Sequence, residues 1–148
     1  MTLVVDASAI AAIVFGEAEG ATIAAHIDGE TLISPLLFDY EMANIGWKKL
    51  RRHPDKQATL MAAMSRVPSL PISKVAVPID KLFALAVETG LTAYDASYLW
   101  LAMSRDVELV TLDNELARVN QALRELRRTR KTRLYEPNER PASTSVRV

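Results

Sequence analysis

The sequence predicts an α/β protein in which a short, mostly parallel sheet is covered by helices on both faces. Short apolar runs rich in β-branched residues alternate along the chain with longer segments of helical periodicity, and this alternation is typical of parallel sheets. The 148 residues are 49% hydrophobic, which is enough for one domain. A domain of this size buries about 68–70% of the surface that its unfolded chain exposes.

The first part of the chain predicts two strands and two helices. Residues 3–5 are a β-branched-rich run that ends at an acid, and residues 7–13 follow with the pattern of a helix. Helical periodicity resumes over residues 17–27, where alanine and isoleucine recur on one side. Asp28-Gly29 then marks a turn before a second strand at residues 31–33.

The middle of the chain predicts a pair of helices, a strand and a further helix. Residues 36–52 have apolar side chains on one face and charged ones on the other, and residues 54–66 predict a second helix antiparallel to this one. Residues 70–72 predict a third strand. A helix over residues 75–88 follows, with Pro78 in its first turn, where the missing N–H breaks no helical hydrogen bond.

The last predicted elements repeat the layout of the first. Residues 94–104 predict a strongly apolar helix. Residues 108–112 are an apolar strand that ends at an acid, and residues 114–126 predict the helix after it.

Four acids stand beside these elements. Asp6 and Asp113 each follow a strand, Asp95 stands at the start of the apolar helix, and Glu41 lies on the helix of residues 36–52. Ligands of parallel sheets bind outside the carboxyl ends of the strands, so we expect these acids to meet there. Either protons or a cation can relieve their repulsion, and hydrated Mg²⁺ or Mn²⁺ is the expected answer at neutral pH.

Each acid also has an ordinary explanation. Asp6 and Asp113 stand where helix N-caps are common, Thr92 and Asp95 have capping-box spacing, and Glu41 could face solvent. Capping alone does not account for three acids at one edge of a sheet.

Three polar residues could support the acids. Ser8 and Thr111 each lie two residues from an aspartate and could orient its carboxylate. Asn44 is three residues from Glu41 and shares its helix face, so its amide could bond a carboxylate, a water or a phosphate. Divalent ions lower the pKa of bound water and offset charge on phosphate oxygens. The four acids and these polar residues together therefore predict metal-dependent phosphate chemistry.

The charge distribution favours a nucleic acid substrate. Residues 1–47 hold seven acids and no Lys or Arg, whereas residues 48–148 hold eighteen basic and eleven acidic residues. The basic part could hold the phosphates of a nucleic acid. Because phosphates and acids repel each other, a metal would be needed before the phosphates could approach the acidic part. Chance combined with a basic tail is the alternative explanation.

Several other classes find little support. The chain has no cysteine, which excludes disulfides and thiolate zinc sites and fits a reducing cytoplasm. No charge-free run approaches the roughly 20 apolar residues of a membrane-spanning helix. A glycine-rich phosphate loop is absent, and His26 and His53 fall in different predicted helices, so neither nucleotide-driven chemistry nor a histidine relay is indicated.

In order and spacing, four blocks of the sequence resemble the PIN domain, and most closely the VapC-type toxins of toxin–antitoxin systems. The blocks are Leu3-Val4-Val5-Asp6-Ala7-Ser8-Ala9, Glu41-Met42-Ala43-Asn44, the segment from Thr92 to Ala102, and Leu109-Val110-Thr111-Leu112-Asp113. The resemblance covers about residues 2–123, and the third block is the most specific. It implies the three-layer α/β/α sandwich of the PIN fold.

The resemblance further implies an endoribonuclease that uses Mg²⁺ or Mn²⁺, with Asp6, Glu41, Asp95 and Asp113 at the acidic positions of the family. Ser8, Asn44 and Thr111 match its accessory polar positions. A homodimer is implied, and so is a small antitoxin that inserts a segment, often with a basic residue, into the active site. Two alternatives stay open: a PIN nuclease of RNA processing that is not a toxin, and a non-catalytic module that binds RNA or protein.

The end of the chain departs from the PIN pattern. We expect the domain to span residues 1–135, with 133–135 as a candidate last strand, and residues 136–148 to be a polar, disordered tail. The Arg-rich stretch 124–133 replaces the short apolar strand that usually closes the family's fold. RNA binding, antitoxin contact and a solvated appendage are all compatible with it.

Overall fold

The computed structural model describes residues 1–133, with side chains described as far as residue 130. Within this range the strands form one sheet in the order β3-β2-β1-β4, and every pairing in it is parallel. The strands are β1 (Thr2–Val5), β2 (Thr31–Pro35), β3 (Ile72–Val75) and β4 (Glu108–Val110). The α-helices are α1 (Ala7–Val14), α2 (Gly20–Ile27), α3 (Phe38–Arg52), α4 (Gln57–Met64), α5 (Ile79–Thr89), α6 (Ala93–Arg105) and α7 (Asn114–Arg133).

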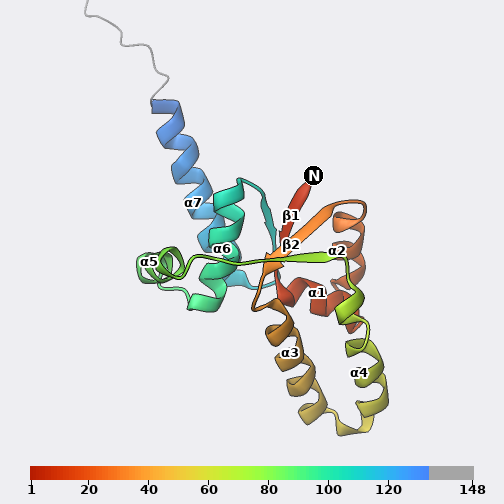
Figure 1. Ribbon diagram of the computed structural model, residues 1–148. Coiled ribbons are helices and arrows are strands. Elements are labelled where there is room, and N and C mark those ends of the chain that lie inside the picture. The colour runs from red at the N-terminus through yellow and green to blue at the C-terminus, as the bar shows by residue number, and fades with distance from the viewer. Residues whose placement is uncertain (134–148) are drawn as a thin grey trace, which may run out of the picture.

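The sheet separates two hydrophobic cores, which confirms the predicted three-layer α/β/α arrangement. Side chains alternate between the faces of a strand. Leu3 and Val5 of β1 therefore pack in one core, with α1, α2 and α3, while Val4 between them packs in the other. Figure 1 shows α1 to α4 gathered on one side of the strands and α5 to α7 on the other.

Helices α3 and α4 form the antiparallel pair that the sequence predicts, and together they project from the sheet (Figure 1). A glycine makes their close contact possible. A Cβ atom at Gly46 would lie 2.9 Å from Sδ of Met64, which is closer than a methyl group can approach. The short 3-10 turn Pro54–Lys56 joins the two helices, so the second helix of the pair is shorter than predicted.

The boundaries of β3 and α5 differ from the prediction. The strand expected at residues 70–72 instead runs from Ile72 to Val75, because this segment pairs with residues 32–35 of β2 and so gains backbone hydrogen bonds. The helix expected from residue 75 begins only at Ile79. Pro78 is its N-cap in an extended conformation, not a member of its first turn.

Three other elements also differ at their ends. Helix α2 begins at Gly20, later than the expected residue 17, and β4 ends at Val110 instead of residue 112. Helix α7 continues to Arg133, beyond the expected residue 126, so the Arg-rich stretch is helical. Arginine is a good helix former, and two arginines of this stretch bond to backbone carbonyls at the end of α6 and the turn after it.

The predicted last strand at residues 133–135 is wrong for Arg133, which ends α7, while Leu134 and Tyr135 lie outside the described residues. The tail of residues 136–148 also lies outside them. Within the described part of the chain, no helix has the length and apolar character needed to cross a bilayer.

Candidate functional site

Asp6 lies at the carboxyl end of the central strand β1, as predicted. It is 5% exposed, and its backbone occupies the N-cap position of α1, although its carboxylate makes no capping hydrogen bond. Instead, Oδ2 accepts a hydrogen bond of 2.7 Å from Oγ of Ser8 and one of 2.6 Å from Oγ1 of Thr111. Capping therefore does not explain this carboxylate. Ser8 orients it as expected, whereas Thr111, expected to orient the carboxylate of Asp113, bonds Asp6 because β4 pairs with β1.

The loop after β4 fixes the direction of both hydroxyls. The N–H of Leu112 donates to Oγ of Ser8 at 3.0 Å, and the N–H of Asp113 donates to Oγ1 of Thr111 at 3.0 Å. A hydroxyl has one proton to donate, and a donor on its lone pair directs that proton away. The protons of Ser8 and Thr111 are thus directed at Asp6, and neither hydroxyl bonds its Oδ1 atom.

Glu41 presents an unsatisfied carboxylate oxygen from α3. Its Oε2 accepts a hydrogen bond of 3.3 Å from the hydroxyl of Tyr98 on α6, whereas its buried Oε1 has no hydrogen-bond partner among the described residues. Burial raises the pKa of Glu41 from 4.5 to about 7, and the charges of Asp6 and Asp95 raise it too, against the lowering effect of Tyr98. Glu41 is therefore poised to accept a proton or a cation near neutral pH.

Asp95 and Thr92 confirm the predicted capping pair at the start of α6. Oγ1 of Thr92 accepts from the N–H of Asp95 at 3.1 Å and donates to its Oδ2 at 3.0 Å. Burial raises the pKa of Asp95, and the negative charges of Asp113, Asp6 and Glu115 also raise it, while the hydrogen bond from Thr92 lowers it. Asp95 thus combines a structural role with membership of the acidic group.

Asp113 caps α7, because its Oδ1 accepts a hydrogen bond of 2.8 Å from the N–H of Leu116.

Asn44 lies one turn from Glu41 on α3. It lines a cavity of about 460 Å³ together with Glu41 and Asp95. No hydrogen bond joins its amide to a carboxylate among the described residues, so of the expected partners a water or a phosphate remains for Asn44.

The four predicted acids affect one another electrostatically, because the pKa of Glu41 and that of Asp95 both respond to Asp6. Among residues 1–133, however, no three acidic or histidine side chains are arranged closely enough to hold a metal ion together as they stand. The donor set still fits a hard divalent cation in two respects. It consists of oxygen atoms, and one of them, Oε1 of Glu41, is buried without a hydrogen-bond partner in the described part of the chain.

The sequence prediction missed the role of Tyr98. Its side chain is fully buried, and burial beside the charges of Glu41 and Asp6 raises its pKa. A buried tyrosine hydroxyl needs a polar partner, so a tyrosine inside the apolar segment 96–103 was a usable signal. The prediction also missed Lys48, Tyr40 and Tyr94, which line the cavity with the acids.

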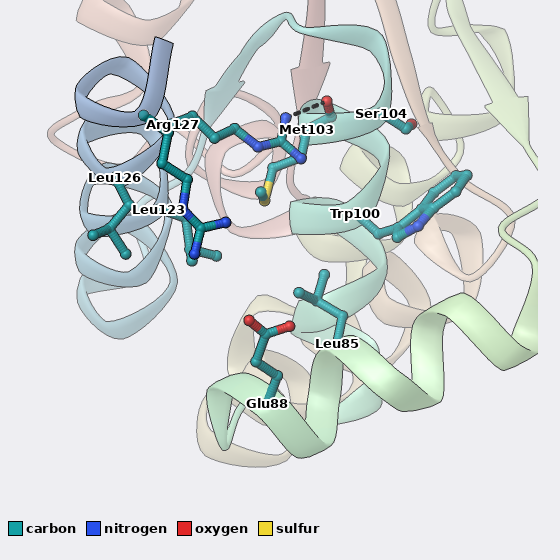
Figure 2. A pocket seen from close by; sticks show the side chains of 9 residues that line it. Leu85, Glu88, Trp100, Met103, Ser104, Leu123, Leu126 and Arg127 are labelled. Carbon is teal, nitrogen blue, oxygen red and sulfur yellow. Dashed lines mark hydrogen bonds between the residues drawn. The ribbon is translucent and has the colours of Figure 1, made fainter. Parts of the chain in front are cut away.

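A second cavity of about 460 Å³ lies between α5, α6 and α7 and holds none of the four acids (Figure 2). Trp100 and Leu85 contribute apolar surface to it, and Glu88 of α5 and Arg127 of α7 also line it. Among the described residues its lining contains no lysine. Arg127 donates a hydrogen bond of 3.0 Å to the carbonyl of Met103.

Comparison with known proteins places the geometry in context. Residues 3–122 match the family model of the PIN domain. The chain is 35% identical over 128 residues to Ribonuclease VapC3 of Pyrobaculum aerophilum, an alignment that covers 83% of this chain and 98% of the relative. Over 117 residues it is 37% identical to Exonuclease VapC9 of the same organism, covering 76% and 80% of the two chains.

The fold also resembles a solved structure, that of PAE2754 from Pyrobaculum aerophilum. The TM-score is 0.66 at 33% sequence identity, and the superposition covers 80% of this chain and 84% of the other.

Proposed function

This chain belongs to the PIN-domain family, and on that premise we propose that it is a VapC-type ribonuclease, the toxin of a toxin–antitoxin pair. Two observations support the chemistry. Asp6 and Asp113 stand just after β1 and β4, and Glu41, whose pKa responds to Asp6, has a buried Oε1 without a hydrogen-bond partner among the described residues. Oxygen atoms of this kind suit Mg²⁺ or Mn²⁺, which we propose as the cofactor.

The protein's own residues then have distinct tasks. We assign Asp6, Glu41, Asp95 and Asp113 to holding the cation. When bound, a divalent ion would lower the pKa of a coordinated water and offset charge on the phosphate oxygens. Ser8 and Thr111 hold the Asp6 carboxylate in one orientation. Tyr98 stabilises the ionised form of Glu41, and Asn44 is free to bond a phosphate or a water.

Cleavage of RNA tests the proposal. The purified full chain should cut RNA in Mg²⁺ or Mn²⁺ and stop on addition of a chelator. Asp6→Asn should abolish cutting while circular dichroism and melting show an intact fold. Asp55→Asn, a change of an exposed acid away from the site, is the matched control and should cut normally. Cutting that persists in Asp6→Asn contradicts the proposal.

We propose internal cleavage of the RNA, although one relative is named a ribonuclease and the other an exonuclease. A circular single-stranded RNA distinguishes the two modes, because it offers no end. Linearisation of the circle in Mn²⁺ supports internal cleavage. A circle that stays intact while the linear form of the same RNA is degraded contradicts it.

We further propose that the toxin acts in the cytoplasm, where its RNA substrate is found, and that a small antitoxin occupies the acidic cavity with a basic side chain. Arginine forms strong bidentate pairs with carboxylates. Growth arrest on expression, relieved by Asp6→Asn, would separate a toxin from an RNA-processing enzyme. An active nuclease whose expression leaves growth unchanged would favour processing.

A homodimer through α5 is the assembly that we propose. Ile79, Phe83 and Val87 recur one turn apart along this helix and are 81%, 70% and 69% exposed. An exposed apolar stripe of this kind indicates an interaction surface. Phe83→Asp should convert a dimer to a monomer in light scattering, and a wild-type chain that is already monomeric contradicts the assembly.

A further inference from the structure

We propose that Tyr40 and Tyr94 form a stacking site for unpaired RNA bases beside the acids, and that Lys48 holds the neighbouring phosphate. The inference rests on the proposed ribonuclease function and adds the side chains that would hold the bases and the phosphate next to the acids. Three features of the cavity at Glu41 and Asp95 carry it: where the tyrosines stand, how exposed they are, and how the charges are distributed.

The tyrosines flank the acids from two different helices. Tyr40 directly precedes Glu41 on α3, and Tyr94 directly precedes Asp95 on α6. Both side chains line the same cavity as the two acids. A strand of RNA whose phosphate lies at the acids therefore has two aromatic rings within the same cavity for the adjoining bases.

Both rings are held out of the core. Tyr40 is 80% exposed and Tyr94 is 67% exposed, whereas Tyr98, which is on the same helix as Tyr94, is fully buried. Exposed aromatic rings beside a catalytic groove are a recurrent platform for single-stranded nucleic acids, because every base has a face that can stack. Bases in a duplex already stack on their neighbours and offer no such face.

The charges of the cavity suit a phosphate at one position. Lys48 is the first Lys or Arg of the chain, after seven acids, and it lines the cavity one turn from Asn44. Within the described residues it makes no ion pair, in contrast to its neighbour Lys49, which pairs with Glu17 at 2.5 Å. An ammonium that pairs with no carboxylate is available to a phosphate, and it leaves the carboxylates of the cavity to the divalent ion.

Binding, measured apart from cleavage, tests the proposal. The probe is a fluorescein-labelled single-stranded RNA of about 12 nucleotides, a length within the usual site sizes for such grooves. Its dissociation constant is measured by anisotropy in Mg²⁺, with the full chain carrying Asp6→Asn so that the probe stays intact. Tyr40→Ala and Tyr94→Ala should each weaken binding by about tenfold, and the Phe variants should bind as their parent does.

Two controls isolate the stacking. Met61→Ala removes another largely exposed side chain (61%) from α4, away from the cavity, and should leave binding unchanged. With a probe that lacks bases at its central nucleotides, the difference between the parent and the Ala variants should vanish. Lys48→Ala should instead weaken binding to both probes and lower the slope of log Kd against log salt by about 0.7.

Unchanged binding of the first probe by both Ala variants overturns the proposal, and that is the result expected if the cavity serves only a protein partner. An equal loss on the probe without bases overturns it as well. Failure of the proposed function shows itself differently, as wild-type protein that binds this RNA but does not cut it in Mg²⁺ or Mn²⁺.

Discussion

Thr111 donates a hydrogen bond of 2.6 Å to Oδ2 of Asp6, although 105 positions separate the two residues in the chain. The contact exists because β1 and β4 are parallel neighbours, with Val5 opposite Val110. Each strand therefore delivers its next polar residue to the same edge of the sheet. The orientation of the Asp6 carboxylate depends on this register and on the loop that follows β4.

Removing the Thr111 hydroxyl should weaken the site without unfolding the protein. Thr111→Val keeps the shape of the side chain but leaves Asp6 with only the hydrogen bond from Ser8. Loss of such a supporting contact commonly costs about 10–100-fold in metal affinity or activity. We expect a loss in this range in both kcat and Mn²⁺ affinity measured by calorimetry, and Thr111→Ser should restore most of it. Wild-type Mn²⁺ affinity in the valine variant would show that the contact is not needed.

Neutralising Asp95 should stabilise the metal-free protein. Its pKa is raised by burial and by the charges of Asp113 and Asp6, so the ionised form is unfavourable in the folded state. Asp95→Asn should raise Tm in chelator by about 2–4 °C, the shift expected for about 1 kcal/mol in a chain of this size. Asp55→Asn should leave Tm unchanged. A lower Tm for Asp95→Asn would mean that its capping role outweighs the repulsion.

Glu41 should make the stability of the metal-free protein depend on pH. Its folded pKa of about 7 exceeds the ordinary 4.5, so between these values the folded state keeps a proton that the unfolded chain releases. The stabilising effect of this proton is therefore complete below about pH 4.5 and is lost as the pH rises towards 7. The free energy of unfolding should fall by about 1–2 kcal/mol over this range, after allowance for partial exposure.

Urea unfolding in chelator at pH 5 and pH 8 measures this effect, and Glu41→Gln is the informative comparison. The glutamine variant cannot titrate, so its loss of stability between the two pH values should be smaller than that of the wild type. Equal losses in the two proteins would remove Glu41 as the cause.

The sequence predicted the elements of the fold well because their hydrophobic periodicity is local. It predicted boundaries poorly where tertiary contacts decide them. Pairing with β2 extends β3 to Val75, and contacts with the end of α6 accompany the extension of α7 to Arg133. Neither interaction can be read from the segment itself.

At the site, the same distinction holds. Ser8 and Thr111 were predicted as supports of aspartates because they lie two residues from one, and the structure places both on Asp6. The contact of Tyr98 with Glu41 joins helices that are 57 residues apart in the sequence. It depends on where the sheet places α3 and α6 relative to each other, which a single sequence does not specify. The assignment of the four acids as metal ligands stays a prediction.

Two arginines of the basic stretch have a structural task, which predicts unequal effects along α7. Arg127 donates to the carbonyl of Met103 at 3.0 Å, and Arg124 donates to that of Val107, so both bond carbonyls at or just after the end of α6. Cations at the carboxyl end of a helix also stabilise its dipole. Arg127→Ala should lower the free energy of unfolding by about 1 kcal/mol.

Arg130 provides the control for this prediction. Like Arg127, it lines the cavity between α5, α6 and α7, but it makes no hydrogen bond among the described residues. Arg130→Ala should therefore change the free energy of unfolding by less than about 0.5 kcal/mol. Equal destabilisation by the two variants, in urea titrations at the same salt concentration, would argue against the capping of α6.

Strand β4 is three residues long and forms one border of the sheet, whereas β1 lies inside it. Short peripheral elements open at a lower free energy than central ones. Because Thr111 follows β4 directly, fraying there would release Asp6 from the Thr111 hydroxyl and leave it only the one of Ser8, while both cores stay packed. Warming would thus switch off RNA cleavage several degrees before the protein melts, so that thermal inactivation and denaturation are separate events.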